Sequence, residues 1–410
     1  MAATLTYAYK GRDASGKSVK GKVDAGSESQ VAARLRTMGV SPTSIAEAPA
    51  GTGLNREINL GALGGGQIGM KDIAIMSRQM ATMISAGLSL LRTLTILTEQ
   101  TANKKLAVVL ETVRNDVETG LSLSDALGKH PADFPPIMLS LIRAGETGGF
   151  LEGSLESVAN NFEAELKLRG TIKSALTYPV VVLIMAVLAV IGMLTFIVPI
   201  FEKMFDDLGS QLPLPTQILV VLSSGMGVGI PMIVVGSIAF TLWWRRNKNT
   251  DRVRRVVDPM KLKMPVFGPL MTKVAIARLT RNFGTMMAAG VPILRSLSIV
   301  GATSGNWVIE QALLKVQESV RQGASIAVPL AAEPVFPSMV TQMIAVGEDS
   351  GALEQMLNKI SDFYDQEVES TTQQLTALIE PLMIAFIGVV IGGMIVALYM
   401  PVFSIFEQIQ

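Results

Sequence analysis

The chain has 410 residues, and its 35 Lys and Arg against 34 Asp and Glu give a formal net charge of +1, so no global field attracts nucleic acid. It contains no cysteine and one histidine, which excludes disulfides and thiolate chemistry and leaves little material for a histidine metal site or a Ser/His/Asp triad. Charged residues make up 17% and hydrophobic residues 49%, a balance that favours a membrane protein over a soluble enzyme.

Residues 1–48 are expected to form a small module made of a β-hairpin and a helix. Apolar and polar residues alternate on both sides of a turn signal at 13–16, which is typical of two paired strands. Helical spacing over 27–38 ends at a glycine, and this pattern predicts one short helix. The Gly-rich residues 49–69 then predict a flexible linker.

The hairpin contains a match to a nucleotide-binding motif. Residues Gly11–Ser18 fit the phosphate-binding pattern GxxxxGK[ST], whose loop leads into a helix that binds phosphate at its N-terminus. Here the residues that follow, Val19–Val23, alternate like a strand. The match therefore predicts a hairpin turn, and no nucleotide or other cofactor is expected.

Residues 70–173 are expected to form a bundle of helices. Apolar side chains recur every three or four residues from Met80 to Leu94, and glycines and prolines punctuate the rest of the segment. This pattern predicts about six short helices that pack together.

Four residues of this segment are candidates for contact with a partner. Arg78 begins an apolar helix and is expected to bind either partner acids or internal carbonyls. Gly145, Glu146 and Gly149 belong to a Gly-Glu motif that we expect between two helices. Two interpretations stay open, a structural turn that needs the glycines and a surface carboxylate that forms salt bridges with a basic partner.

Three charge-free stretches are long enough to cross a bilayer, which takes about 20 apolar residues. They predict transmembrane helices at 177–201, 217–242 and 381–406. The spans contain no charged residue that would mark an ion or substrate pathway, so a transporter or channel is the less favoured interpretation.

The flanking charges predict the orientation of these spans. The connection between the first two spans carries a net charge of −2, and two tryptophans at the end of the second span fit an interfacial belt. Eight cations follow the second span: Arg245, Arg246, Lys248, Arg252, Arg254, Arg255, Lys261 and Lys263. Cytoplasmic loops carry such an excess, so we expect a cytoplasmic N-terminus and a C-terminus on the outer side.

Residues 272–376 repeat the first helical segment. The sequence over 78–96 recurs at 281–299 with a constant offset of 203, and later matches keep an offset of 203 or 202. Arg281, Gly347, Glu348 and Gly351 are therefore the second set of candidate partner-binding residues. Two copies on one side of a membrane need an additional crossing between them, and the second span supplies it.

These elements together predict an all-α polytopic membrane protein with two repeated cytoplasmic helical-bundle domains, three transmembrane helices and a small N-terminal α+β module. Neither a metal site nor a catalytic site is predicted, because the carboxylates of the two Gly-Glu motifs lie in separate repeats without a pocket signature.

The repeated motifs also carry a family resemblance. Residues 78–88, the Gly-Glu motif at 145–151 and the Tyr-Pro pair that leads into the first span, together with their second copies, resemble the PilC/GspF family of inner-membrane platform proteins. The resemblance covers nearly the whole chain and includes the N-terminal module. The second copy departs from it at Asn282–Gly284 and Asp349–Ser350.

The resemblance implies a function and a set of partners. It implies a non-enzymatic protein of the bacterial inner membrane that couples cytoplasmic hexameric ATPases to the insertion and removal of pilin subunits at the base of a type IV pilus. The equivalent type II secretion platform, which acts on pseudopilins, is the alternative. It further implies contacts with other inner-membrane assembly proteins and membrane lipid, self-association into a homo-oligomer, and no nucleic-acid partner.

Overall fold

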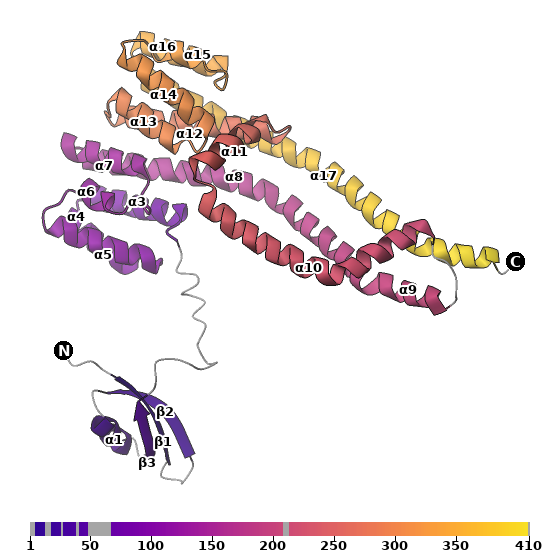
Figure 1. Cartoon of the computed structure of the whole chain (residues 1–410). Coiled ribbons are helices and arrows are strands. Elements are labelled where there is room, and N and C mark those ends of the chain that lie inside the picture. The colour runs from indigo at the N-terminus through magenta and orange to yellow at the C-terminus, as the bar shows by residue number, and fades with distance from the viewer. Residues whose placement is uncertain are drawn as a thin grey trace. The chain divides into compact units, whose positions relative to one another are not determined.

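The computed structural model describes residues 5–12, 18–25, 28–37, 41–47, 67–207 and 213–408. The chain forms two compact units, Met1–Gln67 and Ile68–Gln410 (Figure 1). The predicted hairpin turn at 13–16 and most of the predicted linker lie outside the described residues.

The N-terminal unit is a three-stranded antiparallel sheet with one helix. Strands β1 (Leu5–Arg12) and β2 (Ser18–Ala25) form the predicted hairpin, and α1 (Glu28–Thr37) is the predicted helix. The third strand, β3 (Ser41–Glu47), was not predicted; it pairs with β1 and gives the order β2-β1-β3. The GxxxxGK[ST] segment thus connects two paired strands, a context that lacks the helix that a phosphate-binding loop requires.

Each repeat contains five short helices and a long sixth one. The first repeat is built from α3 (Met70–Ser85), α4 (Leu90–Gln100), α5 (Lys104–Glu118), α6 (Leu123–Gly128), α7 (Pro136–Gly148) and α8 (Leu151–Gly192). The second repeat is built from α12 (Phe267–Ala288), α13 (Ile293–Thr303), α14 (Trp307–Arg321), α15 (Ala327–Ala331), α16 (Ser338–Ser350) and α17 (Leu353–Gln408).

Local sequence signals set the helix ends. The side chains of Ser89, Asn103 and Ser122 accept hydrogen bonds from backbone N–H groups at the starts of α4, α5 and α6, and Asn306 does so for α14. The apolar faces of these helices meet in one continuous core that contains buried side chains of both repeats, such as Leu141 and Phe283. The two repeats are therefore packed as one body.

Three helices are long and apolar enough to cross a membrane (Figure 1). The first runs over Leu151–Met204, in which α8 continues through a π-helical turn (Met193–Ile197) into α9 (Val198–Asp207). The others are α10 (Leu214–Asn247) and the segment Leu353–Met400 of α17. At most 17% of the most apolar window of each helix is buried within the protein, so lipid is the environment that their side chains require.

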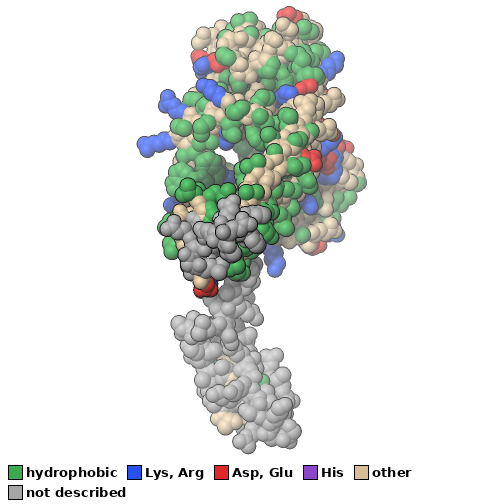
Figure 2. All heavy atoms as spheres, turned by 90° about the vertical axis from the view of Figure 1, so that its right-hand side faces the viewer, with side chains coloured by type: hydrophobic (Ala, Val, Ile, Leu, Met, Phe, Trp, Pro, Cys, Tyr) green, Lys and Arg blue, Asp and Glu red, His purple; other side chains and the backbone are tan. Residues whose placement is uncertain are grey.

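The sixth helix of each repeat is continuous with a membrane span. No break separates the bundle part of α8 from its apolar part, although Pro179 lies inside the helix. Helices α8 and α17 also run side by side, and the Thr376 hydroxyl lies 3.4 Å from the Ala175 carbonyl oxygen, which accepts its hydrogen bond. Figure 2 views the molecule from the right-hand side of Figure 1, toward the ends of the spanning helices, and shows many hydrophobic side chains on that face.

Two buried hydroxyl groups connect the spans near one end. The Thr216 hydroxyl donates a hydrogen bond to the Ala397 carbonyl of α17, and the Ser223 hydroxyl donates one of 2.6 Å to the Leu194 carbonyl in the π-helical turn. A π-helical turn disturbs the regular ladder of backbone bonds, and polar side chains are a common source of contact between membrane helices. These two bonds tie α10 to both of the other spans.

Candidate functional site

The Gly-Glu motifs lie inside helices and not between them, which corrects the expected position. Gly145 and Glu146 belong to the last turn of α7, and Gly347 and Glu348 belong to the last turn of α16. A helical apolar pattern runs up to each motif, so only the final glycine ends the helix. That glycine, Gly149 or Gly351, has a left-handed backbone with φ of 74° or 68°, a conformation that glycine adopts without strain.

The two motif carboxylates bind the N-terminus of a neighbouring short helix. Glu146 accepts hydrogen bonds from the backbone N–H groups of Leu123 (2.5 Å) and Ser124 (3.1 Å) at the start of α6. In the second repeat Glu348 accepts the equivalent bonds from Ile326 (2.6 Å) and Ala327 (2.8 Å) at α15. A carboxylate placed there satisfies free N–H groups and interacts favourably with the helix dipole. Each carboxylate is thus engaged within its own repeat.

The first glycine of each motif allows two helices to approach closely. A Cβ atom at Gly145 would lie 3.0 Å from the Leu151 Cα atom and closer still to the Ser154 side chain. A Cβ atom at Gly347 would lie 2.9 Å from the Leu353 Cα atom. Backbone cannot yield at such distances, so each glycine sets the packing of the fifth helix against the sixth.

Arg78 joins the first and sixth helices of the first repeat. Its guanidinium donates to both oxygens of Glu163 at 2.7 Å and to Glu156 at 2.6 Å, and it also bonds to Asn160. The hydrogen bonds with Glu163 and then Glu156 raise the pKa of Arg78. The same contact lowers the pKa of Glu163 below its usual value. Arg78 therefore binds two carboxylates and the side-chain carbonyl of Asn160, all within its own repeat.

Arg281 occupies the equivalent place in the second repeat. Only 8% of Arg281 is exposed, and its guanidinium donates to both oxygens of Asp365 on α17. Asp365 lies 202 residues after Glu163, so the ion pair between the first and sixth helices occurs in both repeats. The sequence repeat located both arginines but not their acids, which lie 84 or 85 residues further along the chain.

The junction between the repeats contains polar contacts that the sequence did not reveal. Glu165 of α8 bonds to Arg278 of α12 at 2.7 Å and 2.9 Å, and Asn161 bonds to Asn282 at 3.0 Å. Desolvation lowers the pKa of Arg278 below its usual value, and the nearby charge of Glu165 opposes this effect. These contacts hold the two bundles in one arrangement.

This junction joins different faces of the two repeats. The first repeat contributes α7 and α8, and the second contributes α17, which packs most extensively against α8, together with α12 and α13, whose first-repeat counterparts α3 and α4 lie outside the junction. By the repeat offsets, the counterpart of Arg278 is Ile75 and the counterpart of Asn161 is Phe363, and both are exposed, at 46% and 41%. The junction could have been located by comparing equivalent positions of the two repeats, because a junction residue is polar in one copy and its counterpart is apolar in the other.

The described residues contain no group of three or more His, Cys, Asp or Glu side chains that could hold a metal ion. The principal charged clusters described above are ion pairs that connect helices. Their geometry can transmit force between the bundles and the spans, since each pair links the first helix of a repeat to the helix that enters the membrane.

Comparison with known proteins matches the whole architecture. Residues 76–199 and 279–401 each match the family described as type II secretion system (T2SS), protein F, and residues 1–46 match the N-terminal domain of that protein. The chain is 42% identical to a type IV pilus assembly protein PilC of Myxococcus xanthus over 100% of this chain and 97% of that protein.

Two further relatives, one from each kind of machine, are also similar over nearly the full length. A type IV pilus assembly protein PilC of Thermus thermophilus is 42% identical over 97% of this chain and 98% of its own length. A type II secretion system protein F of Xanthomonas campestris is 31% identical over 98% of this chain and 99% of its own length. The similarity thus extends over the N-terminal module, both repeats and all three spans.

Proposed function

Because the chain belongs to the type II secretion system protein F family, we propose that it is a non-enzymatic inner-membrane platform of a type IV pilus assembly machine. In this role it couples cytoplasmic hexameric ATPases to the insertion and removal of pilin subunits at the pilus base. The three apolar helices of the chain suit an inner-membrane protein of this family.

The observation that carries the choice of machine is the gradient of identity. Relatives named as pilus assembly proteins reach 42% identity over essentially the full length, whereas relatives named as type II secretion protein F reach 30% or 31%. The pilus platform is therefore the proposal, and the secretion platform acting on pseudopilins is the alternative.

The packing of the molecule supports a mechanical role. A shared core joins the two repeats, and α8 and α17 pass without interruption from the bundles into the membrane. A force applied to either bundle is thereby passed to a span, because a close-packed core transmits strain and a helix is stiff along its axis. We place the repeats and the N-terminus in the cytoplasm because the basic segment after the second span follows the positive-inside rule.

We propose that the protein forms homo-oligomers through the faces that the internal junction leaves free. The junction joins unlike faces, so copies of this contact can continue from one chain to the next, as in heterologous assemblies. Ile75 and Phe363, the counterparts of junction residues, are exposed large apolar side chains on these free faces. Contact with a second chain would cover them.

A deletion strain complemented with the wild-type gene tests the proposed function. Loss of surface pili on deletion and their return on complementation is the expected result, with secretion unchanged. Loss of secretion with normal piliation would instead assign the protein to the secretion machine.

Cross-linking in native membranes followed by affinity recovery tests the partners. A hexameric assembly ATPase and the major pilin are expected in the recovered complex. Recovery of this chain alone from cells that assemble pili would contradict the platform role.

A further inference from the structure

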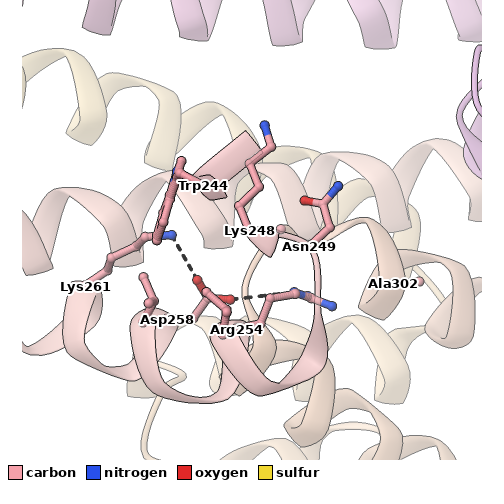
Figure 3. Close-up of a pocket in the computed structure, with 10 residues that line it drawn as sticks. Trp244, Lys248, Asn249, Arg254, Asp258, Lys261 and Ala302 are labelled. Carbon is pink, nitrogen blue, oxygen red and sulfur yellow. Dashed lines mark hydrogen bonds and ion pairs between the residues drawn. The ribbon is translucent and has the colours of Figure 1, made fainter. Parts of the chain in front are cut away.

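A polar cavity of about 380 Å³ lies where the second span emerges from the membrane. It is bordered by the end of α10, by α11 (Asp251–Lys263) and by the connection between α13 and α14 (Figure 3). The polar and aromatic residues that line it are Trp244, Lys248, Asn249, Arg254, Asp258 and Lys261.

The negative charge in this cavity is already compensated. Asp258 is only 4% exposed, and one of its oxygens accepts a hydrogen bond of 3.0 Å from the Lys261 ammonium. Its other oxygen accepts the backbone N–H of Trp307 at 3.0 Å and lies 3.8 Å from Arg254 Nε. Asp258 thus fixes α11 to the start of α14, and it offers little to an entering cation.

The other polar groups that line the cavity are hydrogen-bond donors, which suit an anion. Three cations line it against one acid, and because Arg254 pairs with Glu310 at 2.6 Å and Lys261 pairs with Asp258, Lys248 is the uncommitted cation among the lining residues. Within the described part of the chain, neither the Lys248 ammonium nor the Asn249 amide makes a hydrogen bond or an ion pair, and in Figure 3 both point away from the Asp258–Lys261 pair. A free ammonium beside a free amide offers several N–H donors, which is the chemistry that a phosphate group needs.

The surroundings of the cavity belong to a membrane interface. Trp243 and Trp244 end the apolar part of α10, and α11 begins after a connection of three residues, 248–250. Val256, Met260 and Met264 follow one another at intervals of four and are 66%, 60% and 44% exposed. An exposed apolar stripe next to cations is the pattern of a helix that lies in the headgroup region.

We propose that this cavity binds the phosphate headgroup of an anionic phospholipid from the cytoplasmic leaflet while α11 lies in the interface. The assignment to that leaflet rests on the cytoplasmic placement of the repeats proposed above. The positive-inside rule accounts for Arg245 and Arg246 at the helix end, but it requires no cavity with uncommitted donors. A lipid is favoured over soluble phosphate because the cavity adjoins a span and an exposed apolar stripe.

Intrinsic fluorescence of the purified, detergent-solubilised full chain tests this proposal. Of the three tryptophans of the chain, Trp244 lines the cavity and Trp307 bonds to its Asp258, so the emission reports on its occupancy. The protein is titrated with short-chain phosphatidylglycerol, with short-chain phosphatidylcholine and with inorganic phosphate. We expect a saturable change with phosphatidylglycerol only, weakened about fivefold by Lys248→Gln, since one cation at a membrane surface contributes about 1 kcal/mol.

Lys104→Gln is the matched control, because Lys104 is an exposed lysine on α5 with no ion pair in the described structure. If both variants weaken phosphatidylglycerol binding equally, then the effect comes from general surface charge and the proposed site is wrong. If inorganic phosphate binds saturably with the same affinity as phosphatidylglycerol, then a lipid is not the specific occupant of the cavity. The absence of any saturable change with phosphatidylglycerol would refute the proposal, and it would leave the platform role untouched because no pilus component is present.

Discussion

The carboxylates of the Gly-Glu motifs are helix caps, which gives their substitution a definite cost. We expect Glu146→Gln to lower the free energy of unfolding by about 1–2 kcal/mol, because a neutral amide accepts weaker bonds from the N–H groups of Leu123 and Ser124 than a carboxylate does. Thermal unfolding of the detergent-solubilised protein measures the change.

Glu118→Gln is the control for this prediction, since Glu118 is exposed at the end of α5 and has no ion-pair partner among the described residues. It should leave the unfolding temperature nearly unchanged. If Glu146→Gln is equally neutral in stability and yet abolishes recovery of the assembly ATPase, then the surface interpretation of the motif is the correct one.

The ion pair between Arg78 and Glu163 makes stability depend on pH. Its hydrogen bonds lower the pKa of Glu163 from an ordinary value of 4.5, so the contribution is full above that value and is lost as the pH falls through the lowered pKa. We expect the wild type to unfold at a higher temperature than Glu163→Gln at neutral pH, and the two to converge in strong acid. The difference is modest because the Glu163 side chain is 45% exposed. A difference that persists unchanged in strong acid would contradict this account.

The sequence located the charged residues that form the ion pairs and helix caps, but it did not locate their bonding partners. The repeat offset pointed to Arg78, Glu146 and their second copies. Their partners lie 21 to 85 residues away along the chain and come close only when the bundle packs. Neither helical period nor motif spacing contains that information, so the motif carboxylates were open to interpretation as surface groups.

At the scale of elements, the contact between α7 and α8 predicts opposite effects for two glycine substitutions. Gly145→Ala should destabilise the protein by about 1–3 kcal/mol, because the added methyl group meets the backbone of Leu151. Gly153→Ala should stabilise it by up to about 1 kcal/mol, because Gly153 lies within α8 with no atom of a neighbour within 4 Å of the added carbon. Unfolding temperatures of the two variants decide the matter; equal shifts would show that close approach of the helices is not the function of Gly145.

Most elements followed from local patterns, but strand β3, helix α11 and the continuity of α8 did not. Apolar length predicted the spans, and turn residues predicted the short helices. Strand β3 was not predicted because Ser41–Glu47 is largely polar and contains Pro42. Its formation depends on pairing with β1. The continuity of α8 was also missed, since the bundle and the first span were predicted as separate segments; Pro179 is tolerated inside this membrane-spanning helix.

At the scale of the whole molecule, we propose that the contact between two chains repeats the internal junction. Asn161 and Asn282 bond at 3.0 Å across it, and their counterparts on the free faces are Phe363 and Gln79. A contact between two chains that repeats the junction would bring Gln79 of one chain against Phe363 of the next. The junction is not recognisable from either repeat alone, because Arg278 and Asn161 have apolar counterparts, Ile75 and Phe363.

Cysteine cross-linking tests this contact without background, because the chain has no cysteine of its own. We expect membranes containing the double variant Gln79→Cys and Phe363→Cys to form disulfide-linked dimers and larger species on mild oxidation. The pair Asn161→Cys and Asn282→Cys serves as the positive control and should cross-link within one chain. Val108→Cys with Phe363→Cys is the negative control, since Val108 is 63% exposed and lies on α5, whereas the proposed contact uses Gln79 on α3. Equal yields from this pair and the test pair would indicate random collision in the membrane, and monomers alone would rule out the head-to-tail arrangement.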